Sequence, residues 1–113
     1  MRLIADIDTE LWLQTEWDGT LEWDDANVRK LKKHNLSVSQ FETLFDEDFV
    51  FAGRVVPTDG IEWGEERLVL YGKTDSGKCL TIIWTKRRQQ LRPISCRSMR
   101  HDEKQTYQSR KNR

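Results

Sequence analysis

The stretch RLVLYGKTDSGKCLTIIWTKRRQQLRPISCR, residues 67–97, decides the fold. Its β-branched, aliphatic and aromatic residues fall into three runs, residues 67–74, 79–86 and 91–97, which are typical of strands. The polar segments between them, residues 75–78 and 87–90, favour tight turns. Another such run at residues 49–56 precedes a turn-rich loop at 57–64. We therefore expect a meander of about four antiparallel strands.

Two helices are predicted before these strands and one after them. Asp24 is a good N-cap for the first helix, which Asn35 can end because asparagine tolerates the left-handed conformation. Ser37 opens the second, with Gln40 completing a capping box. The last helix is expected from Ser98, since acids come early in it and bases late. The predicted fold class is α+β: an antiparallel sheet of about four strands, with two N-terminal helices and one C-terminal helix.

The chain length of 113 residues suits one domain, which we expect to span residues 21–110. Residues 1–20 form an acidic N-terminal extension in which apolar residues alternate weakly. Asp18-Gly19 is a hairpin turn signal, so one or two short strands, or a hairpin, are expected there. Residues 111–113 are interpreted as a basic tail.

The composition excludes several classes of protein. No run approaches the roughly 20 apolar residues that span a bilayer, and Asp6 interrupts any signal-peptide core, so we expect a soluble cytoplasmic protein with no membrane partner. Cys79 and Cys96 lack CxxC spacing and are expected to be reduced, buried thiols. The motifs GxSxG, GxGxxG, HExxH and the P-loop are absent, and neither His34 nor His101 has metal-ligand spacing to nearby carboxylates. No metal or other cofactor is therefore expected.

The charges are balanced overall but sorted along the chain. Residues 1–25 carry eight acids against one base, and residues 86–113 carry ten bases against two acids. A polyanion partner for the basic end is one interpretation. The alternative is that the two ends neutralise each other within the fold.

Arginines are concentrated on the predicted strands and turns. They are Arg67, Arg87, Arg88, Arg92 and Arg97. The odd spacing of Arg92 and Arg97 puts them on opposite faces of a regular strand, unless the irregularity that Pro93 makes plausible intervenes. A solvated sheet face with arginines and aromatic residues would suit RNA. The alternative is structural ion pairing, for which the candidate partners are Glu62, Glu65, Glu66 and Glu103.

Four segments in a fixed order carry a resemblance to a known family. They read Trp23-Asp24-x-x-Asn27-x-x-Lys30-Leu31-x-Lys33-His34, Glu66-Arg67…Gly72…Gly77-Lys78-x-Leu80, Trp84-Thr85-x-Arg87, and Arg92-x-Ile94-Ser95-Cys96-Arg97-x-Met99…Glu103…Tyr107. Over about residues 21–108 this resembles the BrnT family, the toxin half of a bacterial type II toxin–antitoxin pair. The chain departs from the family at Asn35, where Gly is usual, at Cys96, where Ala is usual, and in its N-terminal extension.

The resemblance implies a RelE-like ribonuclease fold and metal-free cleavage of RNA through attack of a ribose 2′-oxygen. It also implies inhibition by a ribbon-helix-helix antitoxin, BrnA-like, which represses the shared operon, and a homodimer or a hetero-oligomer with that antitoxin. A catalytically inactive relative that only binds antitoxin or RNA is the alternative. A third hypothesis has residues 1–25 occupying the basic site as an RNA mimic.

Metal-free cleavage needs acid–base groups and fixed cations around the phosphate. The catalytic candidates are Arg67, Arg87 and Arg97 as phosphate ligands, with His34 and Tyr107 for proton transfer. The RNA-binding candidates are Lys86, Arg88, Arg92 and Arg100. For His34 the alternative is packing at a helix end, and for Tyr107 it is a place in the core.

Overall fold

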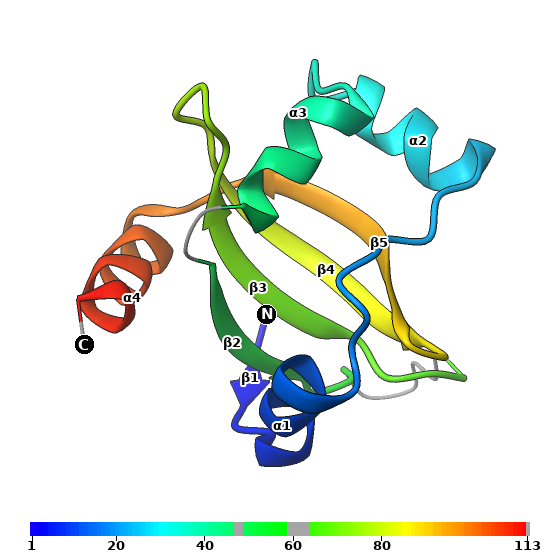
Figure 1. Ribbon diagram of the computed structural model, residues 1–113. Helices are drawn as coiled ribbons and strands as arrows, with labels where there is room; N and C mark the ends of the chain where they lie inside the picture. Colours follow the sequence, from blue (N-terminus) through cyan, green and yellow to red (C-terminus); the bar gives the residue numbers. More distant parts are fainter. Residues whose placement is uncertain (47–48, 59–63, 113) are drawn as a thin grey trace.

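The computed structural model describes residues 1–46, 49–58 and 64–112. In chain order the elements are β1 (Leu3–Ile4), α1 (Ile7–Thr15), α2 (Asp25–Lys32), α3 (Val38–Glu42), the 3-10 helix η1 (Thr43–Phe45), β2 (Val50–Val55), β3 (Leu68–Lys73), β4 (Cys79–Arg87), β5 (Gln90–Ser98) and α4 (His101–Lys111). The strands form one antiparallel sheet in the order β1-β2-β3-β4-β5 (Figure 1). None of the helices described is long and apolar enough to cross a membrane.

The α+β class is confirmed, and β2 to β5 are the four strands of the predicted meander. A fifth strand, β1, comes from the N-terminal extension. The hairpin expected in residues 1–20 is wrong beyond β1, because residues 7–15 form the helix α1. Asp6 caps this helix by accepting a hydrogen bond from the Thr9 amide, and Trp12 packs on Trp84 with ring centroids 5.9 Å apart. Packing of Trp12 on the sheet thus favours a helix where apolar alternation indicated strands.

The other helices begin close to their predicted caps. Asp24 and Asn27 form a capping box at α2, and Ser37 and Gln40 form one at α3. Between them Asn35 adopts the predicted left-handed conformation, with φ 57°. The last helix begins at His101 and not at Ser98, because Ser98 still pairs with Leu80 in the sheet. That helix includes Lys111, so the proposed basic tail begins inside α4.

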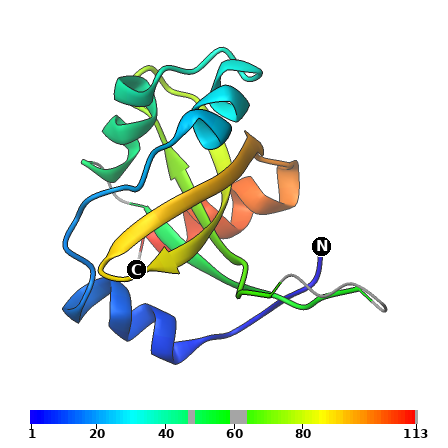
Figure 2. The same cartoon turned by 90° about the vertical axis from the view of Figure 1, so that its right-hand side faces the viewer.

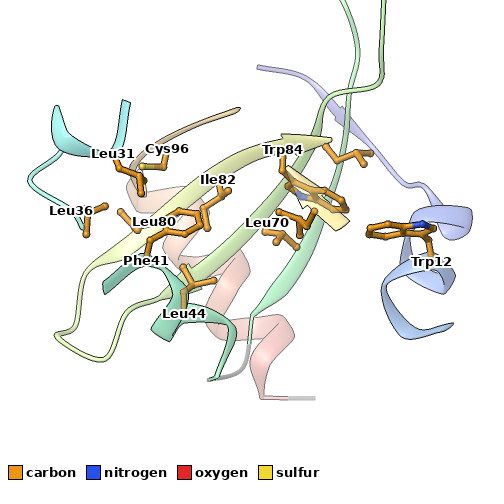
Figure 3. Close-up of a cluster of buried hydrophobic side chains, with 12 residues drawn as sticks. Trp12, Leu31, Leu36, Phe41, Leu44, Leu70, Leu80, Ile82, Trp84 and Cys96 are labelled. Carbon is orange, nitrogen blue, oxygen red and sulfur yellow. The ribbon is translucent and has the colours of Figure 1, made fainter. Parts of the chain in front are cut away.

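Three helices, α1, α2 and α3, together with η1, cover one face of the sheet, which we call the helix face (Figures 1 and 2). Phe41 and Leu44 are fully buried there against Leu70 and Ile82 of the sheet (Figure 3). Gly72 allows this close approach, because a Cβ at that position would lie 2.5 Å from side-chain atoms of Leu44. A compact aliphatic and aromatic core therefore fixes the helices on this face.

In the described part of the chain, the opposite face is covered by one helix, α4, at one end of the sheet (Figures 1 and 2). Met99 and Tyr107 form a smaller buried cluster there with Val69 and Tyr71. At the outer edge of β5 the chain runs back along the sheet: Leu21 forms a parallel bridge with Leu91, and backbone hydrogen bonds link residues 18–22 to residues 89–91. We call residues 18–22 the β5 strap.

Candidate functional site

The strand register brings the predicted arginines of three strands to one face of the sheet. Thr81 lies opposite Arg97 and Thr85 opposite Arg92, and directly opposed residues of paired strands point to the same face. The pairing shifts between Ile83 and Trp84, which leaves Ile94 as an extra residue in β5. This bulge reverses the effect of the odd spacing, so Arg92 and Arg97 share the face opposite the helix face.

Three of these arginines surround Thr85. Leu68 pairs with Trp84, so the register continued by one residue sets Arg67 opposite Thr85, which itself pairs with Arg92. Adjacent strands are about 4.8 Å apart, so the backbones of Arg67 and Arg92 lie about 10 Å apart in one row. Arg87 occupies the next position of β4 on the same face. We call the surface formed by Arg67, Arg87, Arg92 and Arg97 the arginine face.

Arg97 lies about 13 Å from this row, since Thr81 and Thr85 are four residue steps of about 3.3 Å apart along β4. Both of its terminal nitrogens bind Glu103 of α4, with Nη2 2.8 Å from Oε2. Glu103 is 7% exposed and also accepts hydrogen bonds from Thr81 Oγ1 and the Arg100 amide.

These contacts change the ionisation of both partners. Burial alone would raise the pKa of the Glu103 carboxyl, but the hydrogen bonds from Arg97, the Arg100 amide and Thr81 outweigh it, so this pKa lies below its ordinary value. The hydrogen bond from Arg97 to Glu103 raises the pKa of Arg97. The pair is therefore charged, and it fixes the start of α4 against the sheet.

Arg92 is held by two carboxylates of the N-terminal region. Its Nη1 lies 3.0 Å from Glu22 Oε1 and its Nη2 2.8 Å from Asp24 Oδ2. The Asn27 amide, and then Arg92, hold the pKa of Asp24 below its usual range. The acidic N-terminal region therefore neutralises Arg92, and its Asp6 also lies 3.6 Å from Arg54. The ion pairs of Arg87 and Arg97 are made instead with Glu65 and Glu103, which lie outside that region.

Arg87 and Arg88 at the β4–β5 turn remain more accessible. Arg87 Nη2 lies 3.2 Å from Glu65 Oε2, and both side chains are more than a third exposed. Exposed pairs of this kind contribute about 0–1 kcal/mol, so a phosphate can replace the carboxylate at little cost. Arg88 is exposed and adopts a left-handed conformation, with φ 58°. Arg87 is therefore well suited to bind an incoming anion.

A groove of about 550 Å³ adjoins the arginine face beside Arg67. Its lining includes Arg2 and Arg67 together with the apolar side chains of Val55, Pro57 and Ile83. Cationic and apolar groups together can accept a phosphate and an adjoining base.

The remaining predicted site residues do not join this cluster. His34 is exposed at the end of α2, on the helix side of the sheet, and Tyr107 is 2% exposed in the α4 core. Lys86 lies on the helix face, 5.9 Å from the centre of the Trp12 ring. Arg100 is exposed at the N-cap of α4. Among the carboxylates considered as partners, Glu62 lies outside the described residues.

Sequence reasoning missed two features of the site. The first is the pairing of Arg92 with Glu22 and Asp24, which are about 70 residues away in the chain. The second is the central position of Thr85, which depends on strand register. Pro93 was the usable signal, because it indicated the irregularity that brings Arg92 and Arg97 to one face.

A family model described as ribonuclease toxin, BrnT, of type II toxin–antitoxin systems matches residues 23–103. The matched segment covers more than half of the chain, from the residue before the α2 cap to Glu103, and leaves β1 and α1 outside it. Comparisons with curated proteins and with solved structures found no match. The chain therefore belongs to the BrnT family of ribonuclease toxins of type II toxin–antitoxin systems, a membership that implies an antitoxin partner.

Proposed function

We propose that this protein is a metal-independent endoribonuclease whose RNA substrate lies across the arginine face. The observation that carries the proposal is the arrangement of Arg67, Arg87 and Arg92 around Thr85 on one face of the sheet. In this proposal the guanidinium groups of Arg67 and Arg87 attract the polyanion, whereas Arg92 is neutralised by Glu22 and Asp24. The groove beside Arg67 supports it further, since it offers apolar walls for a base next to a bound phosphate.

In the proposed reaction the ribose 2′-oxygen loses its proton and attacks the adjacent phosphorus. The bond to the 5′-oxygen breaks, and that oxygen takes up a proton, which leaves a 2′,3′-cyclic phosphate and a 5′-hydroxyl. Negative charge builds up on the non-bridging oxygens of the phosphorane, where fixed guanidinium donors stabilise it. We assign this role to Arg67 and Arg87.

Arg92 and Arg97 do not stabilise the phosphorane in this proposal, because carboxylates already hold their side chains. Their role is to hold the N-terminal region and α4 in position against the sheet. His34 and Tyr107 receive no proton-transfer step, since His34 lies on the other side of the sheet and the Tyr107 side chain is buried. Arg88 and Arg100 are exposed and would add attraction for the RNA backbone.

We propose that a ribbon-helix-helix antitoxin, BrnA-like, controls this activity. We also propose that the toxin acts in the cytoplasm and has a RelE-like fold. Family membership supports this proposal. A search of the neighbouring reading frames for a small protein of that type would test it.

Binding of RNA without cleavage is the second candidate function. The ion pairs of Arg92 and Arg97 favour it, because a guanidinium held by its own carboxylate stabilises a phosphorane less than an open one. Such a protein would shift RNA in a gel with a strong dependence on salt but release no fragments.

The experiment that separates these candidates incubates the purified chain with total RNA and EDTA. We expect cleavage with cyclic-phosphate ends, reduced about 10²–10³-fold in Arg67→Ala and in Arg87→Ala. The matched control is Arg29→Ala, which removes an exposed arginine of α2. Binding without products would select the second candidate. Equal losses in all three variants, or activity only with added metal, would contradict the proposed site.

A further inference from the structure

The outer edge of β2 is only partly paired. In the part of the chain that the structure describes, β1 pairs with Arg54 and Val55 alone, so residues 50–53 have a strand neighbour on the β3 side only. At Gly53 the backbone has φ 139° and comes so close to β1 that a Cβ would lie 2.7 Å from the Ile4 carbonyl oxygen. Beyond Ile4 the chain continues into α1, so residues 50–52 are partly exposed along this edge, whereas Gly53 is buried against β1.

A groove of about 770 Å³ lies along this open edge. Residues 49–53 of the β2 region line it, and its other linings come from α1, including Glu10 and Leu13, and from α4, including Thr106 and Arg110. Figure 1 shows α4 beside β2 and α1 below it. Arg110 Nη1 donates a hydrogen bond of 2.7 Å to the Phe51 carbonyl oxygen. One backbone acceptor of the edge is therefore occupied by a side chain that is itself exposed and exchangeable.

We propose that an extended segment of the antitoxin adds to residues 50–52 of β2 as a further strand in this groove. An open strand edge offers a row of N–H and C=O groups that another backbone can pair with. RNA does not present a row of amide N–H and C=O groups at the spacing of a β-strand, and the groove lining contains one arginine against one glutamate, which suits a peptide better than RNA. The proposal rests on family membership, which implies a protein partner, and is independent of the RNA chemistry.

The residues of α1 and α4 that line the groove also predict the side-chain pattern of the added strand. Alternate residues of a strand point to opposite sides, so one set faces α1 and the other faces α4. On the α1 side, Leu13 and Phe51 favour apolar residues and Glu10 disfavours acidic ones. On the α4 side, Arg110 favours an acidic residue. The segment should therefore alternate apolar and acidic residues over about four positions.

The test uses the full chain and, as a probe, the small protein encoded by the adjacent reading frame. Amide hydrogen exchange is measured with and without the probe, and affinity is measured for Arg110→Glu and for the matched control Lys104→Glu, an exposed charge of α4 that does not line the groove. We expect slower exchange at residues 50–52 in the complex. We also expect binding at least about tenfold weaker for Arg110→Glu and unchanged for Lys104→Glu.

Unchanged exchange at residues 50–52, equal effects of the two reversals, or absence of any complex would overturn the proposal. Thermal unfolding of both variants shows whether Arg110→Glu acts on binding or on the fold. RNA cleavage by the free Arg110→Glu variant should match that of the unsubstituted chain, because Arg110 is outside the arginine face. Failure of strand addition and failure of the ribonuclease proposal thus give different results.

Discussion

On the helix face of the sheet, Phe41, Leu70 and Ile82 are fully buried, whereas on the arginine face Arg87 and Arg97 keep a substantial part of their side chains in solvent. The first face is held by close packing of carbon atoms, which fixes the helices but leaves no group for chemistry. The second is packed against α4 at one end and carries ion pairs elsewhere, of which the exposed pair of Arg87 with Glu65 is one that an anion can compete with. One sheet thus carries stability on one side and a candidate binding surface on the other.

The strongest test of this division removes a large side chain from the helix face. Phe41→Ala should lower the free energy of unfolding by about 3–5 kcal/mol, because it deletes a fully buried ring. Urea unfolding followed by tryptophan fluorescence measures the loss. The exposed substitution Lys104→Ala should change it by less than about 0.5 kcal/mol, and a similar loss there would contradict the comparison.

Trp12→Ala tests whether α1, which lies outside the family match, belongs to the same core. We expect a loss of about 3 kcal/mol in unfolding free energy, because Trp12 is 7% exposed and packs on Trp84. Leu11→Ala, half exposed on the same helix, should have little effect. If deletion of residues 1–20 instead left stability intact and raised RNA affinity, the N-terminal region would act as an RNA mimic and not as part of the core.

Glu103→Gln tests the ion pair at the end of the arginine face. The change leaves Arg97 without its charged partner and should cost about 1–3 kcal/mol of unfolding free energy. Glu65→Gln, which alters the exposed pair with Arg87, should cost less than about 1 kcal/mol. Equal costs would show that burial does not distinguish the two pairs.

The lowered pKa of Glu103 should also make the free energy of unfolding depend on pH. The pKa of Glu103 is below its ordinary value of 4.5, so its contribution to stability is present above pH 4.5 and is lost as the pH falls through the lower folded pKa. Unfolding midpoints measured from about pH 6 to about pH 3 should therefore fall less steeply in Glu103→Gln than in the unsubstituted chain. Parallel curves would rule out this contribution.

The smallest expected effect concerns the two thiols. Burial raises the pKa of Cys96 to about 11, and Cys96 lies in the helix-face core, whereas Cys79 is only partly buried on the other side. A thiol reagent at neutral pH should label Cys79 first and Cys96 only as the protein opens. Cys79→Ser should then remove the fast phase, and its persistence would contradict the assignment.

Local signals in the sequence were enough to predict most of the fold. The capping residues Asp24 and Ser37 and the turn residues between the strands act on their near neighbours, so their effects can be derived without the tertiary structure. The helix α1 was missed because its position depends on Trp12 contacting Trp84, more than 70 residues away. The hairpin expected there illustrates how long-range packing overrides a short alternating pattern.

The candidate site was less predictable for the same reason. The residue types could be chosen from the sequence, and Pro93 indicated an irregular strand. However, the extra residue Ile94 sets which arginines share a face, and strand register cannot be derived from one strand alone. The carboxylates that hold Arg92 and Arg97 come from three-dimensional neighbours, so the accessible and the restrained arginines could not be separated in advance.

The β5 strap has a consequence for the solubility of the free toxin. Residues 18–22 cover the start of the outer edge of β5, where backbone hydrogen bonds link them to residues 89–91, so this part of the edge cannot pair with the sheet of another molecule. Without the strap, this end of β5 would offer unpaired backbone groups to a neighbouring molecule. The strap therefore disfavours self-association of the free toxin through this end of β5.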